Sequence, residues 1–212
     1  MLTSSGIHAA AGPSLRAGLA VLLLATAPFG AAAQEYHVDL NADNVVRFIS
    51  EATIEDFEGV TERIDGFIVL GDGGLVSGAT AGSDFYLEVD LGSLDTGIGL
   101  RNRHMRDNYL ETDRFPYATF SGSFAEVSEG NDGWKRVTGA GDLGIHGVSR
   151  SVEVACDVAP AGSGFRARCS FEVLLSDFDI EIPKVMFMKL ADEIRLELDF
   201  FVTPAHLEGE SP

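Results

Sequence analysis

A basic cluster stands out in a chain that is otherwise acidic. The sequence carries 15 Lys and Arg against 33 Asp and Glu, for a formal net charge of −18. The cluster consists of Arg101, Arg103, His104 and Arg106. Guanidinium groups bind anions through paired hydrogen bonds, so this cluster could hold an anionic or polar group. The alternative is that these charges are solvated or pair with the acidic residues that follow, Asp107, Glu111 and Asp113.

No other set of residues has a spacing typical of catalysis or metal binding. Of the five histidines, the four beyond residue 33, at positions 37, 104, 146 and 206, are widely separated, so none of them forms a ligand pair with another. A nucleophile elbow, Gly-x-Ser-x-Gly, is absent. We therefore expect no catalytic residues and no metal site.

The basic cluster opens a short helical segment that leads into a strand. Met105 and Tyr109 are four residues apart, which predicts one or two helical turns near residues 102–109. Pro116 ends this segment, because the residue before a proline is extended. Small and aromatic residues then alternate with polar ones, which predicts a half-buried strand. The apolar face of this strand carries Ala118, Phe120, Gly122 and Phe124.

The same alternation recurs along the chain and predicts an antiparallel all-β fold. Strands are expected at residues 45–50, 64–70, 84–91, 117–124, 134–145, 152–158, 165–175 and 194–202. Each has one apolar face and one polar face. Both a closed barrel and a two-sheet sandwich produce this pattern, so periodicity alone leaves the two open.

Two cysteines flank a glycine-rich turn between neighbouring strands. If the hairpin pairs Cys156 with Cys169, the same register pairs Val158 with Ala167, Val154 with Phe171 and Val152 with Val173. All of these pairs are apolar, so one register satisfies both features. An even number of cysteines in an exported protein favours a disulfide, and two buried thiols are the alternative.

Three ordered motifs resemble those of the YceI-like family, bacterial periplasmic proteins with a lipocalin-like barrel that bind polyisoprenoid-type lipids. The first motif joins the basic cluster to FPYATF at 115–120, the second is VTGAGDLGIHGVS at 137–149, and the third is LSDFDI at 175–180. The resemblance spans roughly residues 35–204. Two departures are the missing His-Leu pair after Phe48 and an insertion-like segment at 180–190.

The resemblance favours an eight-stranded lipocalin-like barrel that holds a ligand in its lumen. The ligand-binding residues are then the inward-facing apolar ones together with three of the basic cluster: Phe85, Leu87, Phe120, Phe124, Phe171, Leu196, Phe200, Arg101, Arg103 and His104. The alternative is a core filled by these aromatic side chains. Small residues on the same faces, Gly122, Ala118 and Ala167, argue for space in the lumen.

The first 33 residues have the pattern of a secretory signal peptide. Arg16 precedes an apolar run at 17–27, and Ala31–Ala33 follows as a small-residue cleavage site. We therefore expect residues 34–212 to form a single domain in a periplasmic or secreted protein. An uncleaved membrane anchor is the alternative. The acidic surface disfavours nucleic acid as a partner.

The most consistent hypothesis is an exported protein that carries or sequesters an extended, isoprenoid-like lipid. A structural or partner-binding barrel with a filled core is the rival, and an enzyme acting on a lipid is the third hypothesis. No cofactor is expected other than the lipid itself, and a transient membrane-protein partner fits an exported carrier.

Overall fold

The computed structural model describes residues 33–50, 57–71, 73–182, 184–185, 188–189 and 191–205. They all belong to one compact unit, Ala31–Pro212. Residues 1–32 of the predicted signal peptide lie outside the described residues. None of the described helices is long and apolar enough to cross a membrane.

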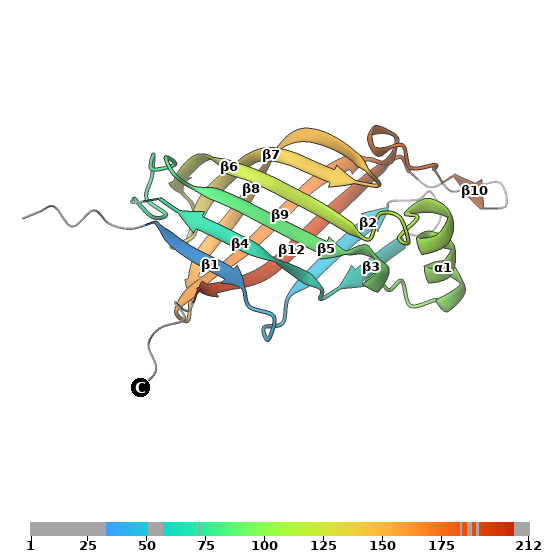
Figure 1. Cartoon of the computed structure of the whole chain (residues 1–212), viewed down its shortest axis with the longest axis horizontal. Coiled ribbons are helices and arrows are strands. Elements are labelled where there is room, and N and C mark those ends of the chain that lie inside the picture. The colour runs from blue at the N-terminus through green and yellow to red at the C-terminus, as the bar shows by residue number, and fades with distance from the viewer. Residues whose placement is uncertain are drawn as a thin grey trace, which may run out of the picture. The chain divides into compact units, whose positions relative to one another are not determined.

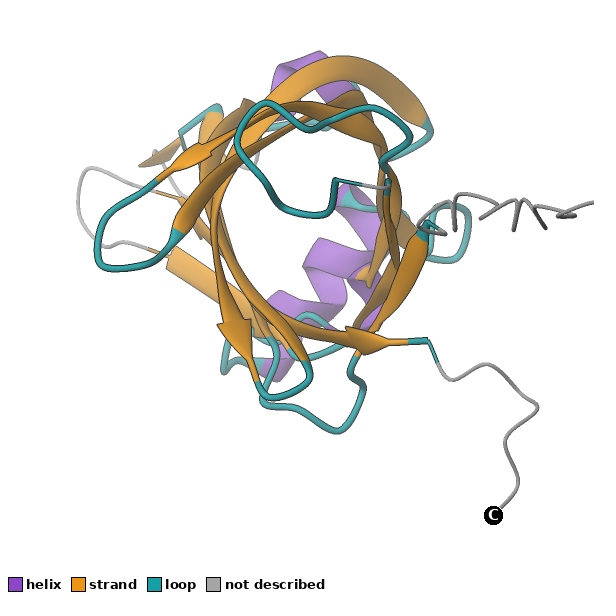
Figure 2. Cartoon of the chain, turned by 90° about the vertical axis from the view of Figure 1, so that its left-hand side faces the viewer, coloured by secondary structure: helices purple, strands orange, loops and turns teal. Residues whose placement is uncertain are grey.

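Eight strands form a closed antiparallel barrel. In order around the wall they are β1 (Gln34–Val38), β4 (Ile64–Leu70), β5 (Asp84–Asp90), β6 (Tyr117–Glu129), β7 (Lys135–Ile145), β8 (Val148–Ala161), β9 (Gly164–Leu174) and β12 (Glu193–Pro204). Pairing of β1 with β12, as at Val38 and Val202, closes the ring. The barrel prediction is confirmed, and closure removes the exposed edges that a sandwich would leave. Figure 2 looks along this barrel.

Two further strands extend the wall at one end. β2 (Val45–Ser50) pairs with the first half of β12, and β3 (Phe57–Thr61) pairs with β2. The sequence predicted β2 but neither β3 nor β1. A small hairpin of β10 (Lys184–Val185) and β11 (Met188–Lys189) forms a separate sheet within the segment that the sequence marks as insertion-like.

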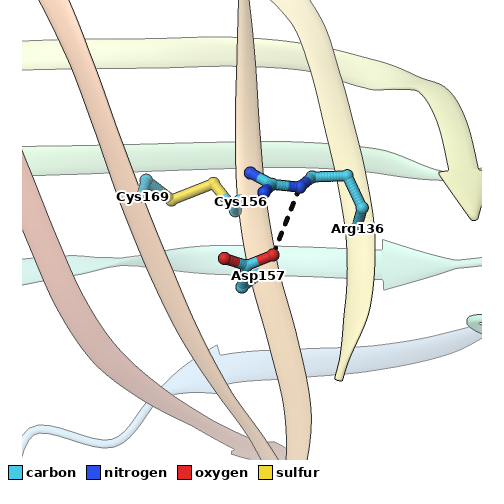
Figure 3. The surroundings of a disulfide bond; sticks show 4 residues. All are labelled: Arg136, Cys156, Asp157 and Cys169. Atoms are coloured by element: carbon cyan, nitrogen blue, oxygen red, sulfur yellow. Dashed lines mark ion pairs between the residues drawn. A yellow bond between two sulfur atoms is a disulfide. The ribbon is translucent and has the colours of Figure 1, made fainter. Parts of the chain in front are cut away.

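The β8–β9 ladder begins at the predicted cysteine pair. Cys156 and Cys169 are opposite each other with their Cα atoms 4.3 Å apart and form a disulfide, so this prediction is confirmed. Figure 3 shows the two cysteines on neighbouring strands. Asp157, the residue after Cys156, forms an ion pair of 3.2 Å with Arg136 of β7.

The predicted register holds on only one side of the disulfide. Val158 pairs with Ala167 as expected, whereas the described ladder does not extend to Val154–Phe171 or Val152–Val173. That part of the prediction is wrong. A short 3-10 helix, η3 (Leu175–Phe178), packs where the two strands separate, and Phe178 and Ile180 are buried there against residues of both strands.

A helical segment crosses one end of the barrel. After a 3-10 turn, η1 (Leu91–Ser93), α1 (Gly99–His104) continues directly into a π-helical turn, η2 (Met105–Tyr109). Figure 1 shows α1 beyond one end of the strands, and Figure 2 shows helix across the far end of the barrel. The predicted helical segment is present but begins earlier, at Gly99. Buried Met105 packs with Leu91 and Leu94 and anchors the segment to the barrel.

Candidate ligand-binding cavity

The barrel encloses a cavity of about 730 Å³ with an almost entirely apolar lining. It is built by the inward-facing residues of the strands, because successive side chains of a strand point to opposite faces. On β12, for example, Ile194, Leu196, Leu198 and Phe200 all line the cavity. The Cys156–Cys169 disulfide lies in the same lining. The interior is therefore not filled by its own side chains.

Nine of the ten predicted ligand-binding residues lie around this cavity. They are Phe85, Leu87, Phe120, Phe124, Phe171, Leu196, Phe200, Arg101 and His104. Arg103 is the exception: its side chain is exposed and does not belong to the lining. Arg103 lies next to the lining residue His104 on α1, so its predicted role in binding a lipid head at the mouth stays a prediction.

Aromatic rings occupy one side of the lumen. Phe85 of β5 contacts two rings of β6, with ring centroids 4.7 Å from Phe120 and 5.9 Å from Phe124. Nearby, Tyr36 lies against Phe165 with centroids 5.1 Å apart, and Tyr36 is opposite Ile68 of β4, which is itself opposite Phe85. Such contacts hold the rings in fixed positions around the empty space.

The small residues on the inward faces have two different roles. Ala118 and Ala167 line the cavity, as the sequence suggested. Gly122 does not, because a Cβ there would lie 2.1 Å from the carbonyl oxygen of Ala140 on β7. This glycine permits a close approach of two strands rather than space in the lumen. Gly139, which the sequence did not single out, lines the cavity beside Phe85.

A polar network holds α1 at the mouth of the cavity. The side-chain oxygen of Asn102 accepts hydrogen bonds from the backbone nitrogen and the hydroxyl of Thr96, at 2.8 and 2.6 Å. Its amide donates to Asp95 at 2.7 Å, and this bond lowers the pKa of the Asp95 carboxyl, with help from the backbone N–H of Gly97. Asp95 in turn exchanges two backbone hydrogen bonds with Val60 of β3, each 2.9 Å.

Arg101 is both a lining residue and part of this network. Its Nε donates to the Thr96 hydroxyl at 2.8 Å, and a second nitrogen donates to the Thr96 carbonyl. The guanidinium carbon lies 4.8 Å from the centre of the Phe57 ring. Part of its hydrogen-bonding capacity is therefore used to fix the mouth.

The rest of the basic cluster does not pair with the acidic residues that follow it in the sequence. Arg106 donates to the carbonyl of Leu94 at 3.1 Å. Glu111 pairs with Arg114 and lies 3.7 Å from His146. Arg103 and His104 are exposed, and neither forms an ion pair with the described part of the chain. Local pairing thus does not account for the cluster.

Several residues at the mouth were missed by the sequence reasoning. Ile98 and Leu100 line the cavity although they are 53% and 62% exposed. Of the described lining residues, only these two and His104 are exposed, so the cavity reaches the surface at the start of α1. Phe48, Phe57 and Tyr109 complete this end. The signal in the sequence was the apolar pair at 98 and 100, directly before the basic cluster.

The fold and the cavity define a closed antiparallel β-barrel with an apolar lumen open at one end. The model of the YceI-like domain matches residues 36–202, and the chain belongs to the YceI-like family. A UPF0312 protein of Vibrio campbellii is 30% identical over 198 residues, covering 91% of this chain and 94% of that protein. A UPF0312 protein of Vibrio vulnificus is 27% identical over 175 residues, covering 78% and 86%.

Solved structures share the fold at low sequence identity. BcnA of Burkholderia cenocepacia superposes with a TM-score of 0.63 at 21% identity, covering 78% of this chain and 99% of that one. A polyisoprenoid binding domain from Saccharophagus degradans, implicated in plant cell wall breakdown, gives a TM-score of 0.58 at 18% identity, covering 80% and 98%. At these identities the likeness concerns the fold.

Proposed function

We propose that this protein binds one extended apolar lipid of the isoprenoid class inside its barrel. The observation that carries the proposal is the cavity of about 730 Å³ with its apolar lining. This volume lies within the range of about 300–1,000 Å³ that ligand pockets occupy. Burial of an apolar chain against such a lining removes its surface from water, which favours binding. The polyisoprenoid binding domain of Saccharophagus degradans, with the same fold, supports this ligand class.

The polar groups of the cavity suggest the orientation of the ligand. Among the described lining residues, Arg101 and His104 are the only ones with basic side chains, and both lie at the mouth. We place the polar or anionic head of the lipid there and the chain along the lumen. The far end of the lumen, near Tyr36 and Phe165, is lined by apolar and aromatic groups that suit the end of the chain.

The proposed role is binding of a ligand rather than scaffolding. A scaffold barrel needs no internal space, and packed protein cores contain few voids larger than a water molecule. The inward residues here leave a cavity far larger than that. Carriage or sequestration of the lipid is the function that uses this space.

Titration with isoprenoid alcohols of increasing chain length tests the proposal. Calorimetry in dilute detergent should show affinity rising with each added isoprene unit until the lumen is full. The control is the Leu87→Trp variant, in which a larger side chain occupies the lumen from β5. Absence of binding for every chain length, with the protein folded, would contradict the proposal.

We further propose that the chain is exported and cleaved after Ala33. The arrangement of Arg16, the apolar run and the alanines supports this. The disulfide also supports it, because such bonds persist in oxidising compartments. Amino-terminal sequencing of the exported protein should give Gln34 as the first residue. A start more than a few residues away would contradict the assignment.

A further inference from the structure

We infer that the mouth of the cavity docks on an anionic lipid bilayer through a rim formed by Ile98, Leu100, Arg103 and His104. This inference rests on the proposed function, because a bilayer is where a water-insoluble chain resides. The rim would let a lipid pass between bilayer and lumen without crossing water.

The apolar half of the rim is unusual for a soluble surface. Ile98 is 53% exposed and Leu100 is 62% exposed, and they are two positions apart. Other strongly exposed aliphatic residues, such as Leu40 and Val76, are isolated in the sequence and lie outside the cavity lining. Ile98 and Leu100, by contrast, border the cavity itself. Exposed apolar patches mark ligand-binding grooves or sites of contact with a protein or a membrane, and this pair lies where the cavity opens.

The basic half of the rim supplies the charge complementarity. Arg103 and His104 follow Leu100 by three and four residues within α1, so the three side chains share one face of the helical segment. Both basic residues are exposed and form no ion pair with the described residues. Because the chain has a net charge of −18, an anionic surface would attract the basic residues of the rim and repel most of the rest of the protein.

This combination matches the physical requirements of interfacial binding. Apolar side chains enter the boundary between headgroups and acyl chains, and neighbouring Lys or Arg residues interact with anionic lipids. The network of Thr96, Arg101 and Asn102 holds the rim in place before contact, so little ordering is needed on docking. Docking on a protein partner would not require the contact residues of the rim to border a cavity.

Flotation of the protein with lipid vesicles tests the inference. The protein should bind phosphatidylcholine vesicles that contain phosphatidylglycerol, and bind vesicles of phosphatidylcholine alone much less. The double substitution Ile98→Ser with Leu100→Ser should weaken binding at least about tenfold, because two buried apolar side chains are lost. Arg103→Gln should weaken binding to the anionic vesicles about fivefold.

The matched control is Leu40→Ser. Leu40 is 66% exposed, as much as Leu100, but lies in the turn between β1 and β2 and outside the cavity lining. This substitution should leave vesicle binding unchanged. Any contribution of the first 33 residues is common to all variants and cancels in the comparison. Failure of the unsubstituted protein to bind, or equal binding by the double variant, would overturn the inference, and the former would point to a protein partner.

A second measurement separates this inference from the proposed function. Isoprenoid alcohol delivered from detergent should bind the Arg103→Gln variant with the unsubstituted affinity, because Arg103 belongs to the rim but lies outside the cavity lining. If the protein takes up no isoprenoid but still binds vesicles through the rim, the proposed function is refuted and the docking surface is retained. Isoprenoid uptake without vesicle binding would refute the docking surface alone.

Discussion

The disulfide between Cys156 and Cys169 joins β8 and β9 at the residue pair where their described ladder begins. On one side of it the strands pair continuously to the turn at Gly162, and on the other side η3 packs between them. The bond therefore fixes the barrel wall at the point where the strands separate. It also faces the lumen.

Replacement of both cysteines by alanine should destabilise the protein by about 3 kcal/mol, the value that the chain-entropy model gives for a loop of this length. The sequence separation is 13 residues. Urea unfolding measures the change, and the unsubstituted protein under reducing conditions should match the variant. Labelling of both thiols in denatured, unreduced protein would show that the bond does not form.

The second prediction distinguishes residues that face the cavity from those that are fully packed. Phe120→Ala should cost less than the roughly 3–5 kcal/mol typical of a packed Phe, because one side of its ring faces the cavity, and it should reduce lipid binding.

The matched control is Ile64→Ala. Ile64 is 1% exposed and lies outside the cavity lining, so its loss should cost about 2–5 kcal/mol and leave lipid affinity unchanged. Urea unfolding and calorimetry measure the two quantities. If Phe120→Ala destabilises the protein by as much as the loss of a packed Phe and leaves lipid binding unchanged, the ring contributes to stability alone.

The sequence predicted most of the wall but not its ends. The bounds of β2 and β4 were predicted correctly, because β-branched and aromatic runs end at turn residues. β1 was missed although Tyr36 and Val38 alternate with polar residues, because five residues give a weak pattern. β3 was missed because Gly59 interrupts it; that glycine makes room for the Phe48 ring.

The size of the lumen could not be predicted. Alternation shows which face of a strand is apolar, but not how far that face lies from the opposite wall. Gly122 illustrates this: it was assigned to open space, and only the β6–β7 contact shows that it serves strand pairing. The position of Arg103 outside the lumen likewise depends on where α1 begins.

The third prediction concerns Arg101. Arg101→Gln should lower the affinity for an isoprenoid chain with a phosphate head about tenfold, since hydrogen bonds to charged groups contribute roughly 1.5–3 kcal/mol. The affinity for the same chain with a hydroxyl head should change little. Calorimetry with both lipids in detergent measures the difference.

The control is Arg103→Gln, which removes an equal charge outside the cavity lining and should affect neither affinity in detergent. Arg101→Lys should retain part of the preference for the phosphate head over the hydroxyl head, because lysine keeps the charge but not the paired hydrogen bonds. An equal loss for both lipids in Arg101→Gln would instead assign Arg101 to support of the mouth through Thr96 and Phe57.

The fourth prediction is a pH dependence at the seam between β9 and β12. Arg166 donates two hydrogen bonds of 2.6 Å to the carboxylate of Asp199, and these lower the pKa of that carboxyl. A lowered pKa in the folded state adds stability above the pKa of the unfolded chain, near 3.9. This stability is lost as the pH falls through the lower pKa of the folded protein.

Asp199→Asn should therefore cost about 1 kcal/mol at neutral pH, a modest value because the pair is partly exposed. The difference from the unsubstituted protein should shrink below about pH 4. Asp157→Asn, which removes the single, more exposed contact with Arg136, should change stability by less than about 0.5 kcal/mol. Urea unfolding at several pH values checks both. A cost for Asp199→Asn that does not decrease in acid would contradict the proposed linkage.

Native mass spectrometry of the protein purified without detergent tests the central claim most directly. We predict a complex whose added mass, after release into organic solvent, is an isoprenoid-type lipid. The Leu87→Trp variant, folded but with less space in the lumen, should carry less of it. A protein that shows only its own mass over several preparations, and that acquires none after incubation with an isoprenoid alcohol, would contradict a lipid-binding function for this barrel.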